Sequence, residues 1–322
     1  MRDFQKRSKD ALTGFAVGDA LGVPVEFETR DGLKRNPVRG MLEYMHHNQP
    51  AGTWSDDSSL VFCTAESLCN GYSLDDIALH FSRWKNNRFW TPHGRVFDIG
   101  ISTSKAIERI DRFIEMGIRM KPIPEHEANQ FENGNGSLMR ILPLAFYLAD
   151  KPMDEQFIVI RDVSALTHAH IRSVIGCFIY VQFVIGLLNG MNKTEAYAEM
   201  QLGVSDFLKD RVSRDELFLY SRILKNMISE YPEASIHSTT YVLHTLEAVL
   251  WCTMRYTTFS ETVLSAVNLG HDTDTIGALT GGLAGLIYGA DKIPKEWIDQ
   301  LARKEDIFIL AKRFGETPWQ KL

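Results

Sequence analysis

Glycine recurs at every fourth position in two segments near opposite ends of the sequence, and this feature constrains the fold most strongly. The first series is Gly14, Gly18 and Gly22, and the second is Gly277, Gly281, Gly285 and Gly289. A four-residue spacing places each series on one side of a helix. Glycine inside a helix costs roughly 1 kcal/mol relative to alanine, so both series need a structural reason. We expect close contact between helix backbones; flexible or membrane-associated segments are the alternative.

Helical periodicity extends over most of the remaining sequence. Apolar residues repeat at intervals of three and four in segments 60–68, 158–166 and 243–254. Alternating patterns typical of strands are short and few, and there is no tandem repeat or low-complexity linker. We therefore predict an all-α fold in which residues 1–322 form a single compact multi-helix domain. Segments 30–51 and 84–100 are rich in Gly, Pro, Asn and His, which predicts loops.

Composition narrows the class of protein. The 322 residues are 44% hydrophobic and 24% charged, which is typical of a globular chain. The net charge of −6 and the absence of a basic run argue against general nucleic-acid binding. The four cysteines lie in apolar segments without metal-type spacing, which indicates reduced core residues.

The same sequence argues against export and membrane insertion. No apolar segment follows the charged N-terminal residues, so we expect no signal peptide and a cytoplasmic location. The most apolar run, residues 174–188, is shorter than the roughly 20 residues that a membrane span requires. A buried core helix is the better interpretation, and no membrane association is expected.

Acidic groups adjoin both glycine series. Glu26 follows the first series, and Asp272-Thr273-Asp274-Thr275 opens the second. A third group, Ser55-Asp56-Asp57, begins another predicted helix. Each group alone is explained by helix capping, since Ser and Asp are preferred N-caps. Capping does not require two acids at each of two helix starts beside glycine-packed helices, however, so the joint pattern favours a site.

Carboxylates and hydroxyls together make an all-oxygen ligand set, which suits Mg²⁺, Mn²⁺ or Ca²⁺ better than zinc. Without a cation the clustered acids would repel one another, and their pKa values would rise. His271 adjoins Asp272 but has no partner histidine, so a packing or supporting role is favoured over zinc ligation.

Three further features are weaker candidates. The loop Asn133-Gly134-Asn135-Gly136-Ser137 precedes an apolar segment, as do loops that bind phosphate at a helix start; a plain turn with a helix cap is the alternative. His168 is a candidate phosphate or ribose contact, or else a satisfied polar residue. Asp98, in a loop that follows aromatic residues, is a candidate contact for a sugar hydroxyl or a leaving group, or else a turn residue.

The sequence resembles the ADP-ribosylglycohydrolase family, including its dinitrogenase-reductase-activating members, over nearly its whole length. The matching motifs are Gly14 to Phe27, Gly52-Thr53-Trp54-Ser55-Asp56-Asp57, Asp98-Ile99-Gly100, Asn133 to Arg140, Thr167-His168 and Gly270 to Gly277. Their order and combination carry the resemblance. One departure is that the family usually has Thr at the position of Ser55; both residues offer a hydroxyl and a carbonyl.

The resemblance implies a cleft that holds two Mg²⁺ or Mn²⁺ ions. The implied metal ligands are Ser55, Asp56, Asp57, Asp272, Asp274 and Thr275. Glu26 would lie beside them, and either Glu26 or a metal-bridging Asp (Asp57 or Asp274) would take the proton of the attacking water. The loop Asn133–Ser137 and His168 would hold the diphosphate of ADP-ribose. Asp98 is a candidate for positioning the leaving guanidine.

The activity implied by this resemblance is hydrolysis of the N-glycosidic bond in an ADP-ribosylated protein side chain, with arginine as the expected linkage. The expected partner is an ADP-ribosylated protein or a small ADP-ribose conjugate. Hydrolysis of O-acetyl-ADP-ribose or ADP-ribosyl-serine is the enzymatic alternative. A non-catalytic ADP-ribose-binding protein is the other, although the intact acidic groups argue against it. The sequence leaves the linkage, the choice of metal and the oligomeric state open.

Overall fold

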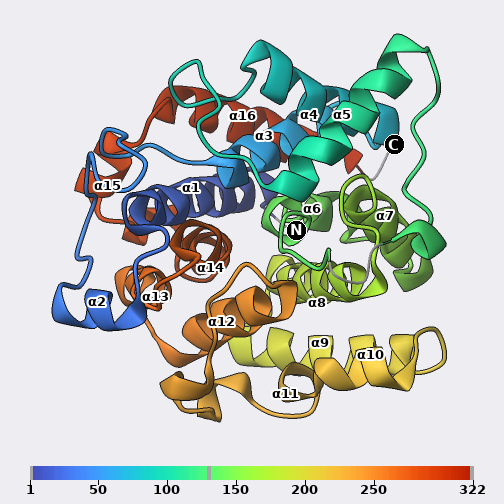
Figure 1. Ribbon diagram of the computed structural model, residues 1–322. Helices are drawn as coiled ribbons and strands as arrows, with labels where there is room; N and C mark the ends of the chain where they lie inside the picture. Colours follow the sequence, from blue (N-terminus) through green and yellow to red (C-terminus); the bar gives the residue numbers. More distant parts are fainter. Residues whose placement is uncertain (1–2, 129–131, 320–322) are drawn as a thin grey trace.

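The computed structural model describes residues 3–128 and 132–319 (Figure 1). In these ranges the chain forms sixteen α-helices and no β-strand, which confirms the predicted all-α fold. The α-helices not introduced below are α2 (Arg30–Arg35), α6 (Leu144–Leu148), α10 (Arg214–Leu219), α11 (Ser221–Leu224) and α15 (Lys295–Gln300). Short 3-10 helices are η1 (Val23–Val25), η2 (Glu125–Glu127), η3 (Leu138–Arg140), η4 (Ile228–Glu230), η5 (Glu233–Ser235) and η6 (Ala290–Lys292).

Two helices from opposite ends of the sequence lie side by side at the centre of the molecule, α1 (Phe4–Gly22) and α14 (Thr273–Tyr288) (Figure 1). They run antiparallel, with their glycines facing. A Cβ atom at Gly18 would overlap with the carbonyl oxygen of Gly277, and one at Gly14 would overlap with that of Gly281. The glycines are therefore required for backbone contact, as the spacing predicts. Gly289 lies just outside the helix and ends it with a positive φ of 93°.

The other helices surround this pair. On α1 packs α16 (Lys304–Glu316), and on α14 pack α13 (Phe259–Val267) and α12 (Val242–Arg255). A further group leads outwards from α3 (Asp56–Leu68) through α4 (Leu74–Asn87) to α5 (Ile101–Glu115). A third group consists of α8 (Ile171–Leu188) between α7 (Met153–Ser164) and α9 (Lys193–Leu208). Their apolar faces share one continuous core.

The most apolar helix belongs to this core. By length and composition α8 could cross a membrane, but 83% of the segment is buried inside the structure, which supports the core-helix interpretation. Cys63, Cys177 and Cys252 are buried and Cys69 is partly buried, and all four are free thiols.

Three local predictions were wrong in detail. The segment predicted as a loop from residue 30 contains α2, because Thr29 caps its first turn by accepting from Gly32 N at 3.1 Å. The segment predicted as a loop from residue 84 begins with the last turn of α4. After Ser137 the chain forms the short helix η3 rather than a long helix, since Pro143 interrupts the segment before α6.

We expect Gly18→Ala to destabilise the protein by about 3 kcal/mol or more, because the new methyl group meets backbone that cannot move independently of α14. The matched control is Gly203→Ala on α9, where the nearest atom is the flexible end of Met153 at 3.3 Å. That variant should be neutral or up to about 1 kcal/mol more stable, because alanine favours helix. Urea denaturation of both variants checks this; equal effects would show that the glycine contact is unimportant.

Candidate active site

The end of α1 and the start of α14 bring acidic residues from both termini together. Thr273 Oγ1 donates to the carbonyl of Gly22 at 2.8 Å, and a Cβ at Gly22 would overlap with the backbone of Asp274. Just beyond, Phe27 N donates to the carbonyl of His271 at 2.7 Å. These contacts place Glu26 beside the start of α14, where Asp272 and Asp274 lie.

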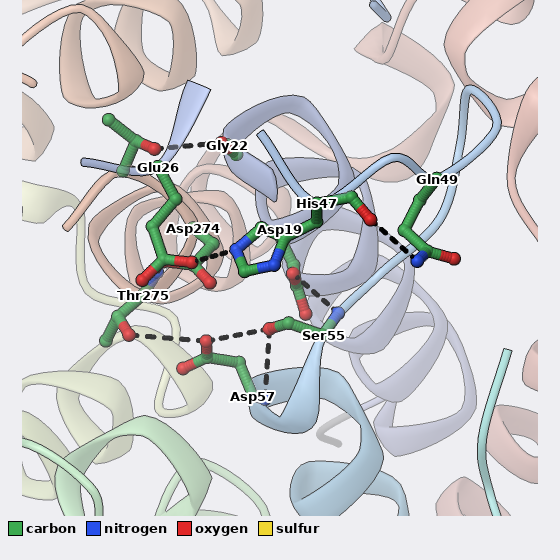
Figure 2. Close-up of polar contacts among 10 residues, drawn as sticks. Asp19, Gly22, Glu26, His47, Gln49, Ser55, Asp57, Asp274 and Thr275 are labelled. Atoms are coloured by element: carbon green, nitrogen blue, oxygen red, sulfur yellow. Dashed lines mark hydrogen bonds and ion pairs between the residues drawn. The ribbon is translucent and has the colours of Figure 1, made fainter. Parts of the chain in front are cut away.

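A third acidic segment is attached to the same place by Asp19. Its carboxylate accepts from Ser55 N at 2.9 Å, from Ser58 N at 3.0 Å and from Ser58 Oγ at 2.6 Å. Asp19 is fully buried in α1, so these bonds fix the first turn of α3 against the central helix pair. The turn carries Asp56 and Asp57 towards Asp274, and Figure 2 shows Asp19, Asp57 and Asp274 near one another.

Most of the predicted site residues line one cavity of about 420 Å³. They are Glu26, Asp56, Asp57, Asp98, Gly134, Asn135, Gly136, His168, Asp272, Asp274 and Thr275. The remaining three, Ser55, Asn133 and Ser137, are buried residues that do not line it. The cavity therefore joins the acidic groups to the glycine loop, to Asp98 and to His168.

Capping does not explain the acids. The N-cap of α3 is Ser55, whose hydroxyl accepts from Asp57 N at 3.2 Å. At α14, Asp272 holds the N-cap position but its side chain caps no backbone N–H. Its carboxylate instead accepts from Asn135 Nδ2. The carboxylates of Asp57 and Asp272 are thus available for another role.

Asp57 has the environment that a cation ligand needs. One carboxylate oxygen, Oδ2, accepts from Ser55 Oγ at 3.0 Å and from Thr275 Oγ1 at 3.2 Å (Figure 2). The other, Oδ1, is buried and has no hydrogen-bond partner in the described part of the chain. A buried carboxylate oxygen without a partner is costly. Oxygen atoms from Asp19, Asp57 and Asp274 lie within 4.8 Å of one another, as do those of Glu26, Asp272 and Asp274, so the donor set fits a hard cation.

Burial and mutual repulsion raise the pKa values of these carboxyl groups in the absence of a cation. Burial, reinforced by neighbouring acids, raises the pKa values of Asp56, Asp57 and Asp274 well above the ordinary value. Burial also raises the pKa of Asp19 to about 7 and that of Asp272 to about 7. A bound dication would reverse these shifts, because it favours the charged carboxylates.

The loop 133–137 is held against the segment that precedes α12. Asn135 N donates to the carbonyl of Thr240 at 2.9 Å, and Val242 N donates to that of Asn133 at 3.0 Å. A Cβ at Gly136 would lie 2.6 Å from His168 Cε1, so only glycine leaves this part of the cavity open. Ser137 lies behind the loop, where its hydroxyl is 2.9 Å from Ser164 Oγ.

Glu26, which lines the cavity beside the acidic cluster, is hydrogen-bonded to His47 Nε2 (Figure 2). The hydrogen bond to Glu26 raises the pKa of His47. Asp98 completes a cluster in which the ligating atoms of all three residues lie within 4.8 Å, and burial together with Glu26 raises the pKa of Asp98 to about 6. The rings of Phe27 and Phe97 lie 6.1 Å and 5.5 Å from the ring of His47.

Asp19 and His47 are the residues that sequence reasoning missed. Asp19 carries a detectable signal, since it is an acid between Gly18 and Ala20 in an otherwise apolar helix segment. His47 carries none: it lies in a predicted loop, and its position beside Glu26 depends on a bond from His46 N to the carbonyl of Pro24 at 3.1 Å.

In this chain, carboxylates from three helix ends converge on one cavity of an all-α fold. The chain matches known proteins along nearly its whole length. The family model described as ADP-ribosylglycohydrolase covers residues 1–321. An ADP-ribosylarginine hydrolase, Tri1, of Serratia proteamaculans (strain 568) is 32% identical over 95% of this chain and 78% of its own length. The ADP-ribosyl-[dinitrogen reductase] glycohydrolase of Rhodospirillum rubrum is 28% identical over 92% of this chain and 91% of its own.

A solved structure titled "ADP-ribosylglycohydrolase-related protein complex" superposes with a TM-score of 0.78 at 28% identity. The match covers 98% of this chain and 99% of that chain. The fold and site thus define a glycosidase-type hydrolase built from helices. The chain belongs to the ADP-ribosylglycohydrolase family, as the sequence motifs indicate, and is an enzyme of that class.

Raised carboxyl pKa values give the cation-free protein a specific pH dependence. Between the ordinary Asp pKa of about 4 and the raised value of about 7 for Asp272, the folded state binds protons that the unfolded chain has released. The free energy of unfolding in chelator should therefore fall as the pH rises from about 4 to about 7. Asp57→Asn should flatten this fall, because it removes one repelling charge.

Urea denaturation in chelator at several pH values measures the effect. The control is Asp206→Asn on α9, which replaces a fully exposed acid and should leave the slope unchanged. A parent protein whose stability rises over this range, or an unchanged slope in Asp57→Asn, would contradict the interpretation of the cluster.

Proposed function

We propose that this enzyme releases ADP-ribose from arginine side chains of modified proteins by hydrolysing the N-glycosidic bond. The observation that carries the proposal is one cavity in which the acidic cluster, the glycine loop and the Glu26–Asp98 pair of carboxylates meet. A dinucleotide-like ligand needs separate places for phosphates, ribose and leaving group, and these three groups supply them. Two relatives support this choice of bond, since they are named for ADP-ribosylarginine and ADP-ribosyl-[dinitrogen reductase].

The acidic cluster fits two Mg²⁺ or Mn²⁺ ions, which would polarise the ribose hydroxyls and acidify a water. Their proposed ligands are Ser55, Asp56, Asp57, Asp272, Asp274 and Thr275. The partnerless Asp57 Oδ1 and the oxygen-only donor set support this assignment. Asp19 holds the first turn of α3 in place, and Asn135 orients the Asp272 carboxylate.

The glycine loop and His168 form the phosphate side of the cavity. Gly134 and Gly136 leave room for a ligand to approach the backbone, and His168 closes the same wall. Burial, with a smaller effect from Arg140, lowers the pKa of His168 to about 3, so the ring is neutral at physiological pH. A neutral imidazole can still donate one hydrogen bond to a phosphate oxygen.

Glu26 is the candidate base. It lies between the acidic cluster and Asp98, and its carboxylate is held by His47. A carboxylate in this position can accept the proton of the attacking water while positive charge develops on the ribose ring, and the neighbouring acids stabilise that charge. Asp57 and Asp274 remain the alternative proton acceptors.

The Glu26–Asp98 side of the cavity favours a cationic leaving group over a neutral one. Glu26 and Asp98 present two carboxylates, and the exposed residue Phe27 also lines the cavity. A guanidinium pairs with carboxylates and stacks on aromatic rings. A neutral acetyl ester or serine O-glycoside lacks the charge for the first of these contacts. This observation favours arginine among the three linkages that the sequence left open.

Chelation should abolish hydrolysis of ADP-ribosyl-arginine, and Mg²⁺ or Mn²⁺ should restore it. Asp57→Asn and Asp274→Asn should lower kcat by at least about 100-fold, because Asn keeps the shape but lacks the charge that a dication needs. Asp206→Asn again serves as the control. Turnover by metal-free protein, verified by elemental analysis, would refute the metal assignment.

Asp98→Asn should lower kcat/KM for ADP-ribosyl-arginine at least about tenfold more than for O-acetyl-ADP-ribose, since a charge-assisted contact of about 1.5–3 kcal/mol is lost only with the cationic group. The exposed acid Glu43 on the neighbouring loop provides the control Glu43→Gln. Equal losses on both substrates would mean that Asp98 does not select the leaving group.

A further inference from the structure

Arg140 is a fully buried cation with an unusual environment. Its side chain is 0% exposed, and no carboxylate pairs with it in the described ranges. Only Nη2 forms hydrogen bonds, to the carbonyl of Val163 at 3.2 Å and to Thr167 Oγ1 at 2.7 Å, whereas Nε and Nη1 have no partner among the described residues. The guanidinium carbon lies 4.8 Å from the centre of the Phe81 ring. A buried charge with so few partners is costly, so its retention needs a reason.

The hydrogen bonds of Arg140 continue to the cavity. Thr167 Oγ1 lies 2.7 Å from His168 Nδ1. Arginine can only donate, so Thr167 Oγ1 accepts from Arg140. The single hydroxyl hydrogen of Thr167 then has one available acceptor among the described residues, His168 Nδ1. Donation by Thr167 leaves Nδ1 unprotonated, which places the ring hydrogen of the neutral imidazole on Nε2.

His168 Nε2 faces the glycine loop. A Cβ built at Gly136 would lie 3.2 Å from Nε2, and one at Gly134 would lie 3.6 Å from it. All three residues line the cavity. The backbone around the ring is also fixed, because Ser164 Oγ donates to the carbonyl of His168 at 2.8 Å and His168 N donates to the carbonyl of Ser164 at 2.8 Å. The ring can therefore present its Nε2–H only into the space above the two glycines.

We propose that Arg140 and Thr167 are positioning residues that fix His168 as a neutral Nε2–H donor for an anionic ligand group. The hydrogen-bonded chain from Arg140 through Thr167 to His168, called the relay below, points its positive end towards that group. The ligand class is a diphosphate, which rests on the proposed function. The uncompensated charge of Arg140 is then explained, because the bound anion supplies the negative charge that the protein lacks there. Arg140 acts through Thr167 and His168 and touches neither the ligand nor the reacting atoms.

The tautomer is tested without any ligand. Nitrogen NMR of ¹⁵N-histidine-labelled protein should show His168 as a neutral ring protonated at Nε2 from about pH 5.5 to about pH 8.5, since burial holds its pKa near 3. Thr167→Val is nearly isosteric but cannot donate, and it should produce a mixture of tautomers or an Nδ1-protonated ring. A parent protein with His168 protonated at Nδ1 would overturn the proposal, whatever the protein binds.

Binding tests the consequence. Thr167→Val should weaken ADP-ribose about tenfold by calorimetry, the equivalent of one hydrogen bond to a charged group, whereas Thr167→Ser should restore affinity to within about twofold. Adenosine, which lacks the diphosphate, should bind both variants and the parent equally. In a His168→Ala background Thr167→Val should cause no further loss of ADP-ribose affinity, because the relay acts only through the imidazole.

Three results would overturn the relay. The first is that Thr167→Val weakens ADP-ribose binding equally in the parent and in the His168→Ala background. The second is that Thr167→Val weakens adenosine and ADP-ribose binding equally, and the third is that Thr167→Ser fails to restore ADP-ribose binding. Each of these results indicates a merely structural role. Arg140→Met provides a further arm and should also weaken ADP-ribose more than adenosine; if this variant does not fold, the Thr167 series decides alone. A parent protein that binds no ADP-ribose would refute the proposed function, and the NMR result would still report on the tautomer.

Discussion

The structure depends on direct backbone contact between α1 and α14. Facing glycines let the two helices approach until the carbonyl of one backbone touches the Cα atoms of the other, as at Gly18 and Gly277. No side chain separates them, so the end of α1 and the start of α14 are fixed relative to each other. The acids at these two ends therefore occupy a defined place, and α3 joins them through Asp19. The rigidity of the site originates in this contact.

The same acidic residues destabilise the folded protein. Several buried carboxyl groups share a small volume, which raises their pKa values and opposes folding when no cation is bound. Arg140, which does not line the cavity, is buried without a counter-ion among the described residues. The acidic cluster thus suits cations, whereas the buried cation of Arg140 suits a nearby anion. The continuous hydrophobic core around α8 and α14 supplies stability that offsets these buried charges.

The cavity is built from both helix ends and loops. Glu26 and Asp272 lie next to the ends of helices, whereas Asp98, which lines the cavity, and His47, which contacts Glu26, come from loops. Loops tolerate substitution more readily than packed helices do. Differences in leaving-group preference between family members can therefore arise at these loops while the acidic cluster stays unchanged.

The sequence alone determined the helical class, the close approach of the two glycine series and the acids at helix ends, because each of these follows from local periodicity and residue chemistry. It did not determine that Asp19, rather than an acid of α3 itself, fixes the first turn of that helix, or that Ser137 lies behind the glycine loop. The pairing of His47 with Glu26 and the chain from Arg140 through Thr167 to His168 were also decided only by the tertiary structure. These contacts join residues whose relative positions depend on how whole helices and loops pack, and no periodicity within one segment records that packing.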